Sequence, residues 1–195
     1  MKLVIASNNR HKVQEIKAIL KDAFDEIVSM NEAGFYGEID ETGDSFRENA
    51  LIKARTICGK LGCAAIADDS GLEVYALNLR PGVYSARFAG YPVDDDKNNQ
   101  KLLDEMKDVP EGKRGARFAC CIALCYPGGA ELVANGYCEG EILFERRGSG
   151  GFGYDPLFYM EAFGMTMAEM PMEQKNKISH RHNALAGLRA MLENK

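Results

Sequence analysis

The stretch ARFACCIALCY, residues 116–126, is almost wholly apolar. Strands that are apolar on both faces are typical of the middle of a sheet that helices cover on both sides. A turn at Pro127 to Gly129 ends this stretch, and residues 131–144 predict further strands, broken at Gly136 and Gly140. Several strands therefore follow one another without helices between them, as in a mixed sheet.

Strands and helices alternate in the first third of the chain. Residues 2–6 predict a buried strand, and the apolar spacing within residues 13–20 predicts a helix after it. Ser45 and Glu48 have the spacing of a capping box at the start of a second helix. Residues 63–67 predict another buried strand, which we expect to end at the following polar residues. Together these patterns predict an α/β fold with a mixed central sheet.

The composition limits the class of protein. A length of 195 residues suits a single domain, or one domain with two lobes, over residues 1–195. The net charge of −5 argues against a general nucleic-acid-binding protein, which would carry a basic face. Six cysteines without a CxxC pair suggest reduced thiols. No apolar run approaches the ~20 residues of a membrane span, and residues 1–6 predict a strand rather than a signal peptide. We expect a cytoplasmic protein.

The loop between the first strand and the first helix is a candidate phosphate site. Free amide groups at the start of a helix, together with its dipole, favour an anion there. A capped surface helix is the alternative, because the glycines of a P-loop are absent. The candidate residues are Ser7, Asn8, Asn9, Arg10, His11 and Lys12.

Two adjacent carboxylates, Asp68 and Asp69, follow the predicted strand at 63–67. Ligands of open α/β sheets bind at the carboxyl ends of strands, and carboxylate oxygens suit Mg²⁺. Neighbouring residues on a strand point to opposite faces, so both acids need not serve one site, and an Asx turn is the alternative. Glu41 is a second candidate metal ligand. Asn49 and Lys53 lie one helical turn apart and can share a face.

A glycine-rich run occupies residues 148–153 and leads into Tyr154, Asp155 and Pro156. Its glycines have the G-x-G-x-x-G spacing, but the following residues predict a strand and no helix, which argues against a dinucleotide-binding fold. A glycine-rich hairpin is the alternative. Phe152 and Tyr154 offer flat faces for a ring. Twenty residues later, a basic run supplies hydrogen-bond donors: Lys175, His180 and Arg181. Neither a zinc ligand set nor a G-x-S-x-G nucleophile elbow is present.

Taken together, these segments closely resemble the inosine triphosphate pyrophosphatase family, whose bacterial members are the RdgB-like dITP/XTP pyrophosphatases. The likeness covers essentially the full length in order. The motifs that carry it are Ser7-x-Asn9-x-x-Lys12, Glu41-Thr-Gly-x-Ser-Phe-x-Glu-Asn49-Ala-x-x-Lys53-Ala54, Ala67-Asp-Asp-Ser-Gly-Leu72, Pro81-Gly-Val-Tyr-Ser-Ala-Arg87, Gly151-Phe-Gly-Tyr-Asp-Pro156 and Lys175-Asn-x-x-Ser179-His-Arg181.

The resemblance implies a Mg²⁺-dependent hydrolase. It implies cleavage of ITP, dITP or XTP between the α and β phosphates, giving a nucleoside monophosphate and pyrophosphate and clearing deaminated purines from the nucleotide pool. It also implies an elongated, two-lobed α/β fold around a long central mixed sheet, an active-site cleft between the lobes, and a homodimer that binds neither nucleic acid nor membrane.

The resemblance also implies a role for each matching residue. Asp69 would be the catalytic base and a metal ligand, and Glu41 would assist with the metal. Residues 7–12 and Lys53 would hold phosphates, and Ser70 would contact the substrate. The nucleoside end would be held by Phe152, Gly153, Tyr154, Asp155, Lys175, His180 and Arg181.

Two other functions compete with this prediction. A Maf-like pyrophosphatase for pyrimidine or modified nucleotides would have a similar fold, but the joined Gly-Phe-Gly-Tyr-Asp and Ser-His-Arg motifs argue against it. A non-catalytic nucleotide sensor is the rival from another class. A sensor would not need the acidic pair and Lys12 for chemistry, so we favour an enzyme.

Overall fold

Seven strands form one sheet in the order β2-β1-β3-β4-β5-β6-β7 in the computed structural model, which describes residues 1–194. β1 pairs in parallel with β2 and β3, whereas β6 pairs antiparallel with β5 and β7. The predicted α/β fold with a mixed sheet is therefore confirmed. The strands are β1 (Lys2–Ile5), β2 (Glu26–Ser29), β3 (Ala64–Val74), β4 (Gly115–Cys125), β5 (Glu131–Ile142), β6 (Phe158–Met160) and β7 (Met165–Thr166).

Five α-helices and three short 3-10 turns complete the part of the chain from Met1 to Asn194. The helices are α1 (Arg10–Leu20), α2 (Phe46–Leu61), α3 (Asp95–Glu105), α4 (Met172–Ile178) and α5 (His180–Glu193), and the 3-10 turns are Tyr75–Leu77, Gly82–Arg87 and Glu161–Phe163.

The chain divides into two units. The first unit comprises residues 1–69, residues 120–136 and the C-terminal segment from His180; the second comprises residues 70–119 and 137–179. The prediction of a single domain with two lobes and a cleft concerns how the two units sit together, and it stays a prediction.

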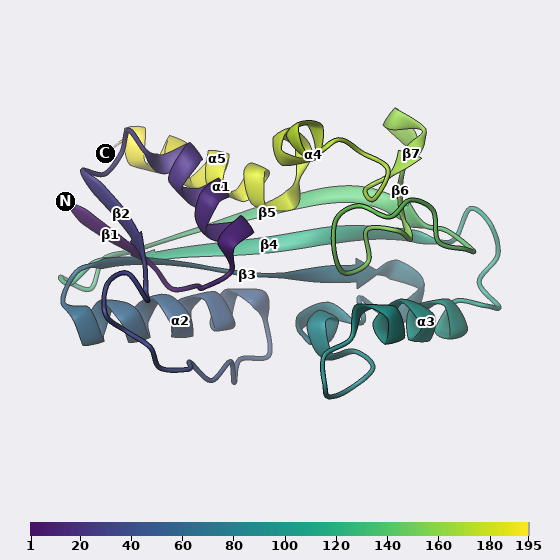
Figure 1. Cartoon of the computed structure of the whole chain (residues 1–195), viewed down its shortest axis with the longest axis horizontal. Coiled ribbons are helices and arrows are strands. Elements are labelled where there is room, and N and C mark those ends of the chain that lie inside the picture. Colours follow the sequence, from purple (N-terminus) through teal and green to yellow (C-terminus); the bar gives the residue numbers. More distant parts are fainter. Residues whose placement is uncertain (195) are drawn as a thin grey trace. The chain divides into compact units, whose positions relative to one another are not determined.

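The two faces of the strands in the first unit carry different helices. Leu3 and Ile5 of β1 pack with Ile16 of α1 and Leu185 of α5. The alternate residues of β1, Val4 and Ala6 just after it, pack instead with α2. Figure 1 shows α1 and α5 on one side of β1 and α2 on the other. Because side chains alternate along a strand, the helix that a strand residue meets follows from its position.

The start of α2 is fixed by the predicted capping box. The Ser45 hydroxyl accepts a hydrogen bond from the Glu48 N–H at 3.2 Å. The Glu48 carboxylate in turn accepts one from the Asp44 N–H at 2.8 Å. The first bond satisfies a backbone donor that the first turn of a helix leaves free, and the second ties the residue before the cap to the same turn. Because the signal is local in sequence, it predicted the position of the helix correctly.

The predicted end of the strand at residue 67 is wrong. β3 continues through Asp68 and Asp69 to Val74, while its neighbour β1 ends beside Ile66. Charged residues normally interrupt a buried strand, but both of these carboxylates are paired with basic side chains. The two acids therefore lie just beyond the carboxyl end of β1 and not at the end of their own strand.

The expected breaks at Gly136 and Gly140 are also wrong, because β5 runs unbroken from Glu131 to Ile142. A side chain at Gly136 would lie 2.2 Å from the His180 carbonyl and the Ala184 nitrogen of α5. A side chain at Gly140 would collide with the Phe158 ring. Glycine in a strand can mark such a close approach of another segment, and here it does so twice.

This packing predicts opposite effects for two glycine-to-alanine changes. Gly136→Ala should lower the free energy of unfolding by about 1–3 kcal/mol, because α5 must shift. Gly59→Ala, at an uncrowded position within α2, should raise it by about 0.5–1 kcal/mol. Urea denaturation followed by circular dichroism measures both. Equal effects of the two changes would contradict the close approach of α5.

Two further observations bear on the sequence predictions. All six cysteines are free thiols, as predicted. None of the helices within residues 1–194 combines the length and apolar character that crossing a lipid bilayer requires.

Candidate active site

The loop after β1 turns the chain into α1. The Asn9 side chain accepts hydrogen bonds from the backbone N–H groups of His11 at 3.0 Å and Lys12 at 3.3 Å. The Asn9 N–H donates to the Ser7 hydroxyl at 3.2 Å. These bonds cap the start of α1, which is compatible with both interpretations of this loop. Phosphate binding by Ser7, the exposed residues 8–11 and Lys12 stays a prediction, which the partly exposed Lys12 side chain supports.

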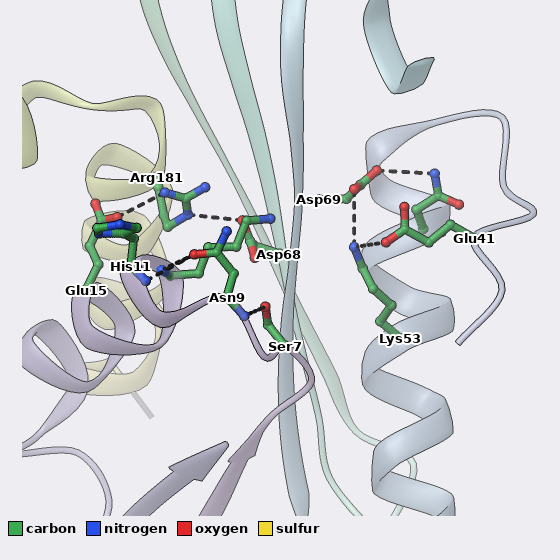
Figure 2. A network of polar contacts seen from close by, with 11 residues as sticks. Ser7, Asn9, His11, Glu15, Glu41, Lys53, Asp68, Asp69 and Arg181 are labelled. Atoms are coloured by element: carbon green, nitrogen blue, oxygen red, sulfur yellow. Dashed lines mark hydrogen bonds and ion pairs between the residues drawn. The ribbon is translucent and has the colours of Figure 1, made fainter. Parts of the chain in front are cut away.

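Asp68 lies on the α1 and α5 face of β3, where two basic groups share one of its oxygens. Its Oδ2 is 3.1 Å from the Lys12 ammonium and 3.0 Å from Nε of Arg181. The Arg181 guanidinium also binds Glu15 of α1 at 3.0 Å (Figure 2). Burial by itself raises the pKa of Asp68, but Lys12 and Arg181 outweigh it and hold that pKa well below its usual range. The carboxylate therefore remains charged.

Asp69 lies on the opposite face of β3, above α2. Its Oδ1 accepts a hydrogen bond from the Lys53 ammonium at 3.2 Å, and Lys53 also binds Glu41 at 2.6 Å. Figure 2 shows Asp69, Lys53 and Glu41 on the other side of the strand from Asp68. Asn49 donates to the second oxygen of Asp69 at 3.2 Å. Both predictions, opposite faces for the two acids and a shared face for Asn49 and Lys53, are confirmed.

The surroundings of Asp69 suit proton transfer. Burial raises its pKa, Lys53 opposes that shift, and the neighbouring Glu41 carboxylate adds to it, so that the pKa lies above its ordinary value. A carboxylate with a raised pKa is a stronger base, and tuning of this kind is typical of general bases. Asp68 has a lowered pKa and binds Lys12 and Arg181. It is therefore suited to holding these two basic side chains in place and not to accepting a proton.

The glycine-rich run forms a loop in the second unit, followed by β6 and no helix, as predicted. The buried Asp155 carboxylate accepts a hydrogen bond from the Phe152 N–H at 2.8 Å and forms an ion pair with Lys175. The Lys175 ammonium lies 4.8 Å from the centre of the Phe152 ring, which is 54% exposed. The loop thus presents an aromatic face beside a charged donor.

Residues of α3 hold this loop by its backbone. The Gly153 N–H donates to the Asp95 carboxylate at 2.7 Å, and the Gly153 carbonyl accepts from the Asn99 amide at 2.7 Å. The Tyr154 hydroxyl donates to the Ser85 carbonyl at 2.8 Å. The sequence did not predict Asp95, Asn99 or Ser85 as partners of this loop. Of the three, only Ser85 lies in a motif of the resemblance, the one at Pro81–Arg87, and that motif indicated no contact.

The predicted site residues fall into two groups. The first unit holds Lys12 and Arg181 beside Asp68 on one face of β3, and Glu41 and Lys53 beside Asp69 on the other. The second unit holds Ser70, residues 152–155 and Lys175. Arg181 has Asp68 and Glu15 as partners, which places it in the first group. Its predicted contact with the nucleoside, like that of His180, stays a prediction, as does a common cleft for both groups.

The class of protein is α/β, with lysine–carboxylate pairs in the first unit and an exposed aromatic ring beside a lysine in the second. A family model described as "Ham1 family" matches residues 3–191. The chain belongs to the Ham1 family. Relatives named dITP/XTP pyrophosphatase confirm the resemblance that the sequence motifs indicated.

Curated relatives match along nearly their whole length. A protein of Desulforamulus reducens named dITP/XTP pyrophosphatase is 52% identical over 185 residues, which cover 95% of this chain and 92% of the relative. A protein of Geobacter sulfurreducens with the same name is 48% identical, with 96% of this chain and 94% of the relative covered. The Maf-like alternative finds no support among them.

Solved structures agree in fold. The Staphylococcus aureus Ham1 protein has a TM-score of 0.91 at 42% identity, with 100% of this chain and 99% of that chain covered. A nucleoside-triphosphatase / dITP/XTP pyrophosphatase from Mycobacterium abscessus has a TM-score of 0.82 at 45% identity, with 96% and 98% covered.

Proposed function

We propose that this protein hydrolyses the non-canonical purine nucleoside triphosphates dITP, ITP and XTP to the nucleoside monophosphate and pyrophosphate. This activity clears deaminated purines from the nucleotide pool. The observation that carries the proposal is the buried Asp69 carboxylate with its raised pKa, hydrogen-bonded to Lys53, in a chain whose relatives are named dITP/XTP pyrophosphatase.

The chemistry follows from the charges. The α phosphorus is shielded by negative oxygens, so attack by water needs a positioned base and neutralisation of charge. Asp69 takes the proton of the attacking water. Lys53 and Lys12 supply positive charge to the phosphates, and the Asp68 carboxylate keeps the Lys12 ammonium in place at 3.1 Å.

Mg²⁺ fits the donors that surround Lys53. Glu41 and Asp69 already share one cation, the Lys53 ammonium, at 2.6 and 3.2 Å. Among residues 1–194 there is no cluster of three or more His, Cys, Asp or Glu side chains able to hold a metal, but Mg²⁺ usually takes only one or two carboxylates and completes its shell with phosphate and water. Glu41 and Asp69 would hold the ion, which would neutralise phosphate charge.

We assign the proposed preference for a purine with a 6-oxo group to the second unit. The exposed Phe152 ring stacks on the base, and Lys175, beside that ring, donates to the oxygen. Adenine would place its 6-amino group against a donor. A polar mismatch of this kind discriminates by up to about 10⁴-fold, more than an apolar pocket achieves.

We further propose a homodimer in the cytoplasm, a compartment in which six free thiols persist.

Release of pyrophosphate from a panel of nucleotides tests the proposal. We expect turnover of ITP, dITP and XTP with Mg²⁺, little turnover without it, and slow turnover of ATP and dTTP. Faster hydrolysis of ATP or dTTP would overturn the substrate assignment. Tight binding of ITP with no pyrophosphate released would favour the nucleotide sensor.

A further inference from the structure

Asn49 of α2 is a buried amide whose two ends have different partners. Its residue is 1% exposed. The Nδ2 group donates to Oδ2 of Asp69 at 3.2 Å, and Oδ1 accepts the backbone N–H of Gly43 at 2.8 Å. The Gly43 N–H can only donate and the Asp69 carboxylate can only accept, so these partners fix which way the amide points.

The two donors of α2 divide the Asp69 carboxylate between them. Asn49 and Lys53 lie one helical turn apart, and Lys53 donates to Oδ1 while Asn49 donates to Oδ2. Rotation of the carboxylate about its last side-chain bond would break both hydrogen bonds. Each oxygen keeps further lone pairs, because a carboxylate can accept about four hydrogen bonds. The pair of donors therefore orients the base without using up its capacity to accept a proton.

The second end of Asn49 holds the segment before α2. A side chain at Gly43 would lie 2.9 Å from Oδ1 of Asn49 and 2.5 Å from Cβ of Glu48, so glycine permits this close approach. Glu41, two residues earlier, binds Lys53 at 2.6 Å. The contacts form a closed ring from Asp69 through Asn49, the residue 41–43 segment and Lys53 back to Asp69.

We propose that Asn49 is a positioning residue for catalysis: it sets the orientation of the Asp69 carboxylate and fixes, relative to it, the segment that carries Glu41. This inference rests on the proposed role of Asp69 as the base. Among other side chains of similar size, an aspartate at position 49 would still accept from Gly43 but would place a second negative charge against Asp69. An alanine would leave both partners without their hydrogen bonds.

The near-isosteric variant Asn49→Asp can keep the hydrogen bond from Gly43 but loses the one to Asp69. We expect kcat to fall about 10- to 100-fold, the range for loss of a hydrogen bond to a charged group, while KM changes by less than about threefold, because Asn49 contacts Asp69 and not the nucleotide. Asn49→Ala should lose at least as much kcat. The exposed Asn31→Asp adds the same charge elsewhere and should leave both constants unchanged.

The Asp69→Asn background supplies the decisive comparison. If Asn49 acts through Asp69, then Asn49→Asp should cause no further loss of the residual turnover once the base is gone. The substrate is whichever triphosphate the wild-type protein hydrolyses fastest, so failure of the purine assignment does not affect this test. An unchanged kcat in Asn49→Asp, a rise in KM alone, or an equal further loss in the Asp69→Asn background would each overturn the inference.

Discussion

Replacement of Asp69 by asparagine is expected to lower kcat by about 10²–10⁴-fold, the contribution of a positioned general base. The amide has nearly the same shape as the carboxylate but cannot take a proton from the attacking water. Lys53 keeps its second partner, Glu41, at 2.6 Å, so the lysine remains in place. The loss should therefore appear in turnover and not in the fold.

Nucleotide binding should largely survive this change. The proposed contacts with the nucleoside come from the second unit, and the proposed phosphate contacts come from Lys12 and Lys53. Calorimetric titration with the nucleoside monophosphate product, together with steady-state kinetics, separates the two effects. Asp108→Asn, at an exposed carboxylate, is the matched control and should behave as wild type. Near-normal turnover in Asp69→Asn would contradict the role of Asp69 as the base.

Features that depend on neighbouring residues were predictable from the sequence. The cap of α2 depends on Ser45 and Glu48, and the opposite faces of Asp68 and Asp69 follow from the alternation of side chains along a strand. The shared face of Asn49 and Lys53 follows from the helical period. None of these needs information from another part of the chain.

Features that depend on distant segments were not predictable in the same way. Asp68 appeared to end a strand, because Arg181, which pairs with it, lies 113 residues later. Gly136 appeared to break a strand because the approach of α5 that requires it is a tertiary contact. The hydrogen bond from the Asn99 amide to the Gly153 carbonyl joins residues 54 positions apart. In the first two cases the local signal gave a wrong strand boundary, and in the third it indicated no partner, because the deciding contact comes from a distant segment.

Loss of the Asp68 carboxylate is expected to have the largest effect on stability. Its side chain is fully buried between Lys12 and Arg181, whose side chain is 6% exposed. Removing one member of a buried ion pair typically costs about 3–5 kcal/mol, because the remaining charge stays buried without compensation. Glu15 still binds Arg181 at 3.0 Å, so we expect Asp68→Ala to fall near the lower end of that range. The midpoint of urea denaturation measures the effect.

The exposed pair of Lys2 and Glu26 provides the control. Glu26→Gln removes a carboxylate from a lysine in the same unit, but solvent screens that interaction, so the midpoint should change little. Turnover of Asp68→Ala at a temperature where it is folded should also fall, because Lys12 loses its anchor. A midpoint like that of wild type would contradict the buried network.

A double substitution tests the cause of the loss. If Asp68→Ala destabilises the protein by removing the Asp68 carboxylate from the buried Arg181 guanidinium, then adding Arg181→Met removes that charge as well. The double variant should then be less destabilised than the sum of the two single variants, since residues in one ion-pair network are coupled. Lys12 contributes little to this coupling, because its side chain is 22% exposed and regains water. Additive losses would show instead that Asp68 contributes through packing alone.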